Sequence, residues 1–308
     1  MRIPRMIQKM LAKMIAGTMY RPFGSIRPSR RTVFERESRT ENMDLEKIYS
    51  EFPIETFSIA SADGVMIPAE YHETENARGI AILAHGYGQN RYVLTPQAKI
   101  FHDLGYSTIM FDQRHFGESK APCSTFGVKE ADDLIALVRY ARDRFGSNVR
   151  IIVLGVSMGA MSVMHAIGKC NLIDAAIQDC GPESMDMILD PFYAALSKEP
   201  NPYFRNEVSR ISARLGASLE ENKPIEGVRK SSVPLLSIQG EADSLVSPQH
   251  AIDITAASGN PLSRIRMFPG REHAYSIQDY DEYSSEINRF LTDVFSDQHN
   301  IVKEKKRA

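Results

Sequence analysis

The chain has 308 residues, of which 43% are hydrophobic and 25% are charged, and its formal net charge at pH 7 is −2. This composition is ordinary for a globular protein and excludes a disordered, collagen-like or disulfide-stapled chain, while the small net charge excludes a global attraction to nucleic acid. Three cysteines without a CxxC spacing argue against a disulfide framework or a zinc site, so we expect a cytoplasmic protein.

The first 31 residues carry eight Lys and Arg and no acidic residue, which leaves 29 basic against 39 acidic residues in the rest of the chain. Basic residues at positions 2, 5, 9 and 13 mark one face of an expected helix. Apolar residues recur at helical spacing on another face: Ile3, Met6, Ile7, Met10, Leu11, Met14 and Ile15. Such a segment suits either packing on its own domain or peripheral contact with an anionic membrane surface. The segment has no apolar run of ~20 residues, so it cannot be a membrane span. Lys9 and Lys13 interrupt its apolar stretch, which argues against a signal peptide.

Residues 21–50 are polar and contain Pro22 and Pro28, so we expect a linker. From about residue 54, short apolar runs alternate with helical patterns. The expected strands are 57–59 and 65–71 as a hairpin, then 80–84, 107–111, 150–154, 175–178, 234–238 and 264–268. The expected helices are 92–104, 130–145, 158–168, 248–257 and 279–295. This alternation predicts an α/β fold with a mostly parallel sheet covered on both faces, which binds ligands at the carboxyl ends of its strands.

The alternation is interrupted between residues 182 and 230 by several prolines among short helical stretches. An insertion at this place predicts a small helical cap above the carboxyl edge of the sheet. The expected organisation is an amphipathic helix and linker over 1–50, core over 51–181, cap over 182–230, core over 231–298 and a charged tail over 299–308.

A G-x-S-x-G pentapeptide, Gly155-Val-Ser157-Met-Gly159, lies between the expected strand 150–154 and the expected helix 158–168. A sharp turn from strand to helix holds the serine in a strained conformation and raises its Oγ above the sheet. Side chains at the two glycine positions would collide with neighbouring backbone. The pattern predicts Ser157 as a nucleophile, and the alternative is a tight turn whose serine caps the helix.

A serine nucleophile needs a base that is oriented by a carboxylate, and in this architecture the acid precedes the histidine. Asp243 follows the strand 234–238, and His273 follows the strand 264–268 in the same way. We therefore predict Asp243 as the acid and His273 as the base. Asp179, at the end of an earlier strand, is the alternative acid. If Asp179 has a purely structural role, it caps a helix or stabilises a turn.

Negative charge on the substrate oxygen requires preorganised N–H donors. We expect one from the backbone of Met158, the residue after the nucleophile, and the other from Tyr87 in the loop after the strand 80–84. Glycines on both sides of Tyr87 let the loop turn its amides inward. His85, in the same loop, is expected to be a buried structural histidine.

Over residues 54–295 the sequence resembles the α/β-hydrolase superfamily. The motifs that carry the resemblance are His85-Gly86-x-Gly88, Asp112-Gln-Arg114-His-Phe-Gly117-Glu-Ser119, the Ser157 pentapeptide, Gly240-x-x-Asp243 and Gly270-x-x-His273. More narrowly, the stretches 126–130 and 178–181 look like the bacterial esterase and serine-aminopeptidase-like branch, which is also similar to monoacylglycerol lipases. The resemblance implies the roles predicted above for Ser157, Asp243 and His273, and hydrolysis of esters, sometimes thioesters or amides, without a metal or organic cofactor.

Two departures from the family pattern stand out. His115 replaces the first glycine of an Arg-Gly-x-Gly loop, and the charged pair Arg271-Glu272 replaces small residues before the base. We expect the first change to alter the shape of the loop and little else. The second either tunes the base or faces solvent.

The resulting hypothesis is a serine hydrolase that cleaves small-molecule carboxylic esters through an acyl-enzyme. Apolar cap residues, among them Met185, Leu189 and Phe192, either line an acyl pocket or pack the cap onto the core. A thioesterase, aminopeptidase or acyltransferase would use the same triad. An aminopeptidase would also need a carboxylate for the substrate amine, for which Glu183, Asp186 and Asp190 are available. A noncatalytic binding protein is expected to lack the serine, acid or base, or one of the two glycines of the Ser157 pentapeptide. All of these residues are present in the sequence.

Overall fold

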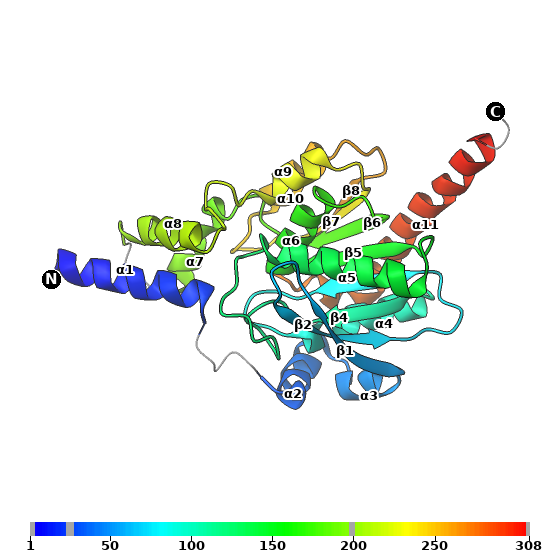
Figure 1. The fold of residues 1–308 in the computed structure, drawn as a ribbon, viewed down its shortest axis with the longest axis horizontal. Coiled ribbons are helices and arrows are strands. Elements are labelled where there is room, and N and C mark those ends of the chain that lie inside the picture. Colours follow the sequence, from blue (N-terminus) through cyan, green and yellow to red (C-terminus); the bar gives the residue numbers. More distant parts are fainter. Residues whose placement is uncertain (1–3, 23–27, 197–200, 306–308) are drawn as a thin grey trace.

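The computed structural model describes residues 4–22, 28–196 and 201–305 (Figure 1). Within these residues eight strands form one sheet in the order β1-β2-β4-β3-β5-β6-β7-β8. Strand β2 is antiparallel to both of its neighbours, and the remaining pairs are parallel. The strands are β1 (Ile54–Ala60), β2 (Met66–His72), β3 (Ile80–Ala84), β4 (Ser107–Phe111), β5 (Ile151–Val156), β6 (Ala175–Asp179), β7 (Leu235–Gly240) and β8 (Arg264–Phe268).

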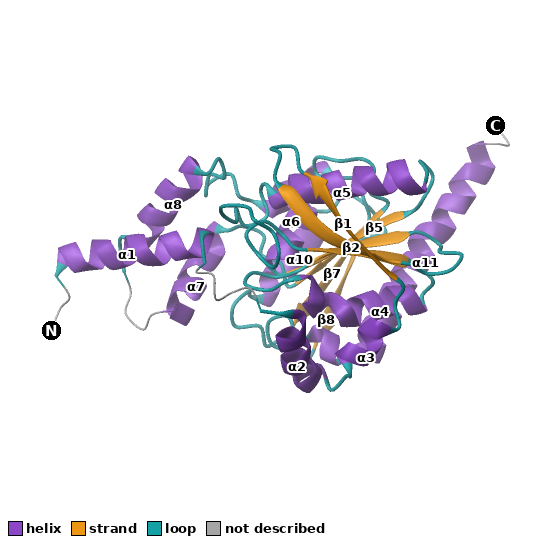
Figure 2. Cartoon of the chain, turned by 60° about the horizontal axis from the view of Figure 1, so that its bottom comes forward, coloured by secondary structure: helices purple, strands orange, loops and turns teal. Residues whose placement is uncertain are grey.

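Both faces of the sheet are buried under helices (Figure 2). Because successive side chains of a strand point to opposite faces, Ile80 and Ile82 enter one apolar cluster while Ala81 and Leu83 enter the other. One face is covered by α5 (Glu130–Phe145), α6 (Met158–Ile167), α9 (Pro224–Lys230) and α10 (Pro248–Ala257). The other is covered by α2 (Arg30–Glu41), α3 (Leu45–Ser50), α4 (Thr95–Asp103) and α11 (Tyr280–Lys305). The predicted α/β fold, with its hairpin and mostly parallel sheet, is therefore confirmed.

The prediction of a linker is wrong for residues 30–50, because this stretch contains α2 and α3. These helices place Val33, Phe34, Leu45 and Tyr49 in the core beneath the sheet. Their many charged residues face outward, so the few apolar anchors were too sparse to stand out as a helical pattern. Ser29 caps α2 by accepting a hydrogen bond from the Thr32 N–H.

The last helix is also longer than expected. The sequence predicts a helix over 279–295 and a charged tail over 299–308, whereas α11 continues to Lys305. No glycine or proline interrupts residues 296–305, so nothing in the sequence of this stretch ends the helix.

The segment inserted between β6 and β7, residues 182–230, contains η2 (Asp186–Ile188), α7 (Leu189–Leu196), α8 (Phe204–Arg214) and α9. Helix α9 packs on α6 as part of the layer that covers the sheet. Helices α7 and α8 lie beyond the sheet, beside the N-terminal helix α1 (Arg5–Tyr20) (Figures 1 and 2).

A third apolar cluster, which we call the outer cluster, joins α1 to the inserted segment and to the core. Its buried members are Ala12, Ala16, Met19, Tyr20, Phe116, Phe126, Met158, Met161, Met185, Ile188, Leu189, Tyr193, Phe204, Val208, Leu219 and Val246. Helix α1 thus packs on its own protein with one face. In the described part of the chain, no helix combines the length and apolar character that a bilayer span requires.

Candidate active site

Ser157 occupies the turn between β5 and α6, with φ 54° and ψ −114°. A non-glycine residue in this left-handed region is strained, so the surrounding packing must impose the conformation. A Cβ at position 155 would overlap the carbonyl oxygen of Gly159, and one at position 159 would overlap that of Ala84. The two glycines therefore allow the helix to start against the strands, and the strained turn presents the Ser157 Oγ.

Three distant segments bring Ser157, His273 and Asp243 together. The Nε2 atom of His273 lies 2.9 Å from the Ser157 Oγ, and its Nδ1 atom lies 2.7 Å from Oδ2 of Asp243. With the proton on Nδ1, the ring donates to the carboxylate and accepts from the serine hydroxyl. This tautomer leaves Nε2 able to take the serine proton.

Asp243 is held as an oriented carboxylate by its own loop. Its Oδ1 accepts hydrogen bonds from the N–H groups of Leu245 (2.9 Å) and Val246 (2.8 Å), and its Oδ2 accepts one of 2.9 Å from Gln239. Burial acts to raise the pKa of Asp243, but the hydrogen bond and charge of His273, with the loop donors, hold this pKa below its usual value. The carboxylate therefore remains ionised beside the histidine.

Asp179, the alternative acid, is oriented elsewhere. The buried hydroxyl of Tyr283 on α11 donates a hydrogen bond of 2.9 Å to its Oδ2. Complete burial raises the pKa of Asp179 to about 7. The partner of His273 is thus Asp243, and Asp179 is a second carboxyl group packed beneath the site.

The loop after β3 faces the same site. His85 is fully buried: its Nδ1 donates to the carbonyl oxygen of Gly86 (2.7 Å), and its Nε2 accepts from the Gln113 N–H (3.0 Å). Burial lowers the pKa of His85, which favours the neutral ring that this pair of bonds requires. His85 therefore shapes the loop, and Tyr87 lies further along it.

Tyr87 and Met158 line one cavity together with Ser157 and His273. Met158 begins α6, so its N–H is among the first-turn groups that no carbonyl within the helix can satisfy. The amino end of the helix also favours negative charge at this point.

This cavity, which we call the Ser157 cavity, has a volume of about 170 Å³ and a mainly apolar wall. Its full lining is Gly86, Tyr87, Gln89, Phe126, Val156, Ser157, Met158, Met161, Pro182, Ile188, Leu245, Val246, His273 and Ala274. Among these residues there is no carboxylate. Nothing in the sequence distinguishes Met161, Leu245 and Val246 from core residues, and Phe126 stands out there only as part of the family-like stretch 126–130.

The predicted acyl-pocket residues Met185 and Leu189 do not line the Ser157 cavity. Both are fully buried in the outer cluster, whereas Ile188, between them, faces the cavity. A short 3-10 helix leads into α7 here, and its tighter turn changes the direction in which successive side chains point. The sequence alone therefore does not show which of these side chains face the cavity. The side chain of Phe192 lies outside the described residues.

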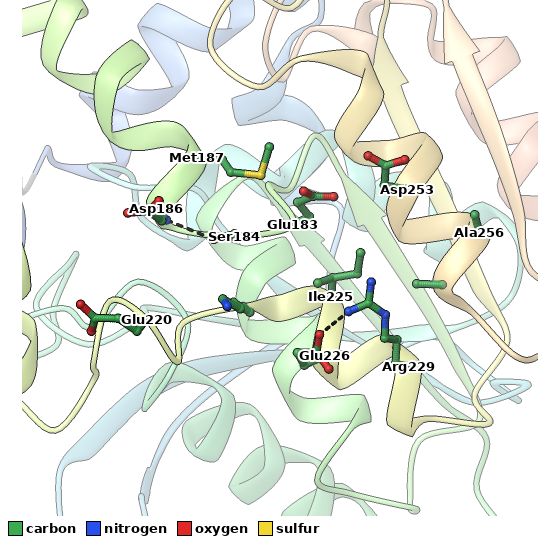
Figure 3. Close-up of a pocket in the computed structure, with 12 residues that line it drawn as sticks. Glu183, Ser184, Asp186, Met187, Glu220, Ile225, Glu226, Arg229, Asp253 and Ala256 are labelled. Carbon is green, nitrogen blue, oxygen red and sulfur yellow. Dashed lines mark hydrogen bonds and ion pairs between the residues drawn. The ribbon is translucent and has the colours of Figure 1, made fainter. Parts of the chain in front are cut away.

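A larger open groove of about 860 Å³ lies beside α9 and α10 (Figure 3). It is lined by Glu183, Ser184, Asp186, Met187, Glu220, Lys223, Ile225, Glu226, Arg229, Asp253, Ala256 and Ala257, and Figure 3 shows the ion pair between Arg229 and Glu226. None of Ser157, Asp243 and His273 lines it. Of the three carboxylates available for a substrate amine, Glu183 and Asp186 line this groove, and Asp186 and Asp190 pair with Arg205.

The two departures from the family pattern have structural explanations. His115 adopts a left-handed φ of 73°, and its ring nitrogens lie 3.0 Å from the carbonyl oxygen of Ala121 and 3.1 Å from that of Pro22. The imidazole thus ties the loop to the end of the N-terminal segment, which a glycine cannot do. Arg271 forms an ion pair with Asp279, and this contact stabilises the loop that carries His273.

Cys180, Asp243 and His273 are the only potential metal-ligand cluster in the described residues, with donor atoms within 4.8 Å of one another. The Cys180 Sγ lies 4.0 Å from Nε2 of His273. Burial raises the pKa of the Cys180 thiol well above its usual value, and a protonated thiol is a poor metal ligand. Because His273 also hydrogen-bonds both Asp243 and Ser157, the cluster is better suited to proton transfer than to metal binding.

The sheet, the strained turn at Ser157, and Asp243 and His273 after successive strands together define an α/β-hydrolase fold, and the chain is a member of the α/β-hydrolase superfamily. The pattern of the prolyl oligopeptidase family (Peptidase_S9) matches residues 96–298, and the chain belongs to this family.

Curated relatives are distant. The chain is 27% identical over 262 residues to the uncharacterized protein YfhR of Salmonella typhimurium, covering 81% of this chain and 86% of the relative. It is 26% identical over 216 residues to the quorum-quenching protein AidA of Acinetobacter baumannii, covering 65% and 66%. Among solved structures, the Pyrococcus furiosus esterase Pf2001 shares 23% identity at a TM-score of 0.66, over 80% of this chain and 92% of the other. That structural likeness supports the fold.

Proposed function

We propose that this protein is a serine hydrolase that cleaves carboxylic esters of small molecules through an acyl-enzyme on Ser157. The observation that carries the proposal is the hydrogen-bonded series from Ser157 through His273 to Asp243, at 2.9 and 2.7 Å, at the wall of an apolar cavity. An intact series of this kind also argues against a noncatalytic binding protein. No cofactor enters the proposed chemistry.

In the first half of the reaction, the Ser157 Oγ bonds to the ester carbonyl carbon while His273 Nε2 takes the hydroxyl proton. Asp243 stabilises the imidazolium that forms. The N–H groups of Met158 and Tyr87 are the proposed donors to the oxyanion. When the carbonyl carbon–oxygen bond to the leaving group breaks, His273 gives its proton to the departing alkoxide.

The second half repeats the same steps with water. His273 removes a proton from the water as its oxygen bonds to the acyl carbon, and the proton then returns to the Ser157 Oγ as the acid leaves. A molecule of ester and one of water thus give an alcohol and an acid, with the enzyme restored.

The size and lining of the cavity favour a short apolar acyl group. Its volume of about 170 Å³ is below the ~300–1,000 Å³ of pockets that enclose drug-sized ligands. Methionine side chains at 158 and 161 adapt to different chain shapes. The lack of a carboxylate in the lining of the Ser157 cavity disfavours an aminopeptidase, which must hold a substrate ammonium group.

One preparation of the full chain tests the proposal against p-nitrophenyl esters of two to twelve carbons, acyl-CoA thioesters and aminoacyl amides. We expect short esters to have the highest kcat/KM, and Ser157→Ala to lower it by at least ~10⁴-fold. Ser184→Ala, which changes a serine of the open groove, is the matched control and keeps full activity. Turnover retained by Ser157→Ala refutes the mechanism, and preferential turnover of amides or thioesters refutes the assigned substrate class.

A further inference from the structure

Helix α1 has a face that nothing in the described structure covers. Ala12, Ala16, Met19 and Tyr20 are buried in the outer cluster, but four apolar side chains on another side of the helix are exposed. Met6, Ile7, Met10 and Met14 are 80%, 38%, 65% and 55% exposed, respectively. They are half of the large hydrophobic side chains that are exposed among the described residues. We call them the outward face of α1.

These four residues form a continuous stripe. At 100° per residue, positions 6, 7, 10 and 14 fall within an arc of about 100° on a helix. Scattered exposed hydrophobics are normal on a protein surface, but a stripe of this width on one helix marks an interaction site.

The charged residues of α1 itself are all positive. Helix α1 contains Arg5, Lys9 and Lys13 and no acidic residue. The Arg5 guanidinium and the Lys9 ammonium lie 5.8 and 5.3 Å from the ring centroid of Tyr203, so both are held where α1 meets the inserted segment. At 100° per residue these cations all lie on one side of the stripe, with Lys13 next to it. An apolar stripe flanked by cations matches a surface that is anionic outside and apolar beneath, which is the structure of an anionic lipid leaflet.

The far end of α1 is attached to the wall of the Ser157 cavity. The carbonyl oxygen of Thr18 accepts a hydrogen bond of 3.2 Å from the Tyr87 hydroxyl, and the Tyr20 ring packs edge-on against Phe126 at 5.3 Å between centroids. Tyr87 and Phe126 both line the Ser157 cavity. One helix therefore connects the outward face to the wall of the Ser157 cavity.

We propose that α1 docks the protein on anionic membranes by inserting Met6, Ile7, Met10 and Met14 at the boundary between headgroups and acyl chains. Docking brings the Ser157 cavity next to the lipid phase, in which apolar esters concentrate. The delivery of esters rests on the proposed function, whereas docking itself does not.

Vesicle sedimentation of the full chain tests the proposal. Vesicles of phosphatidylcholine alone are compared with vesicles that also contain phosphatidylglycerol. We expect binding to the anionic vesicles, reduced roughly tenfold or more by the triple change Met6→Gln, Met10→Gln and Met14→Gln. Lys13→Gln should weaken this binding by about fivefold, and added salt should weaken it further. The double change Met66→Gln and Met187→Gln, at two methionines that are 52% exposed elsewhere, is the matched control and binds like wild type.

Two measurements keep the result unambiguous. Thermal unfolding should be unchanged in the triple variant, because its three positions are exposed. Light scattering after size exclusion tests whether the outward face instead joins two copies: a dimer that the triple change abolishes overturns the proposal, as does equal vesicle binding by wild type and the triple variant.

The failure of docking can be distinguished from the failure of the proposed function. Ser157→Ala should sediment with anionic vesicles like wild type, and the triple variant should hydrolyse dissolved p-nitrophenyl acetate at the wild-type rate. If the wild type hydrolyses the ester but ignores anionic vesicles, only the docking proposal is wrong. If it binds vesicles but hydrolyses no ester, only the proposed function is wrong.

Discussion

The hydroxyl of Tyr87 donates a hydrogen bond of 3.2 Å to the carbonyl oxygen of Thr18, which joins the loop after β3 to the last turn of α1. The same ring stacks on Phe126, with 5.2 Å between ring centroids. One side chain thus fixes the N-terminal helix, forms part of the cavity wall and lies on the residue whose N–H is a proposed oxyanion donor.

Replacing Tyr87 by phenylalanine should keep the ring and its stacking but remove the bond to Thr18. A lost neutral hydrogen bond costs about 1 kcal/mol, which corresponds to a fall in Tm of about 1–2 °C for a chain of 308 residues. Because the loop also holds the proposed donor, we expect kcat/KM for p-nitrophenyl acetate to fall by about fivefold. Tyr140→Phe, which removes a hydroxyl that bonds the exposed Arg144, is the control. Unchanged Tm and kcat/KM in Tyr87→Phe would show that the bond contributes nothing.

Substituting Asp243 and Asp179 one at a time should show which of the two carboxyl groups orients His273. In Asp243→Asn, an amide in place of the carboxylate favours the wrong tautomer of His273 and removes the charge that stabilises its imidazolium, so kcat/KM should fall by about 10³–10⁴-fold. Asp179→Asn should retain activity within about fivefold, because Asp179 bonds Tyr283 instead. Steady-state kinetics on both variants decide the assignment, and a larger loss in Asp179→Asn would reverse it.

The buried Asp179 should make stability depend on pH. Its folded pKa of about 7 lies above the ordinary value of 3.8, so the unfolded chain ionises this carboxyl at a lower pH than the folded chain does. The unfolded state therefore binds fewer protons between about pH 4 and 7, and the contribution of Asp179 to stability falls as the pH rises through that range.

Asp179→Asn removes this penalty while leaving an oxygen that accepts from Tyr283. Its gain in the free energy of unfolding should be larger at pH 8 than at pH 5, by up to about 3 kcal/mol. Urea unfolding at the two pH values measures the difference. Asp253→Asn, which removes a carboxyl group of the open groove, is the control. An equal gain at both pH values would mean that Asp179 is already ionised in the folded protein at pH 5.

The wall residue Ile188 should set the acyl-chain length. Ile188→Ala enlarges the Ser157 cavity, so the ratio of kcat/KM for the eight-carbon ester to that for the four-carbon ester should rise by about tenfold. Met187→Ala is a close control, because the adjacent Met187 lines the open groove instead. The truncation also costs about 2–4 kcal/mol of stability, so the kinetics are measured well below the Tm of the variant. The same ratio in wild type and Ile188→Ala would place the acyl group elsewhere.

The strands and the loops that carry Ser157, Asp243 and His273 were predictable because strong local patterns specify them. A run such as Ile80–Ala84 is apolar at every position only if both faces of the strand are covered, and the glycines around Ser157 are required by backbone contacts within a few residues. Each such signal is contained in a short stretch of sequence. Their relative positions then follow from the order of the strands.

Other features depend on contacts between distant segments, which one sequence does not reveal. The choice between Asp243 and Asp179 is set by the direction of two side chains at neighbouring strand ends. The orientation of Ile188 toward the cavity depends on how the inserted segment meets α1. The apolar pattern of residues 1–20 predicted an amphipathic helix, but only its packing against α8 shows which apolar side chains remain exposed.

Helices α2 and α3 determine how the N-terminal region can be dissected. They seal one face of the sheet with Phe34 and Tyr49, and the buried hydroxyl of Tyr49 donates a hydrogen bond of 2.9 Å to Glu70 of β2. A deletion variant beginning at residue 51 would expose that face to water and leave the Glu70 carboxylate short of a donor. Inactivity or aggregation of such a shortened protein would report a damaged core, so substitutions on the surface of α1 are the sound route to the role of this region.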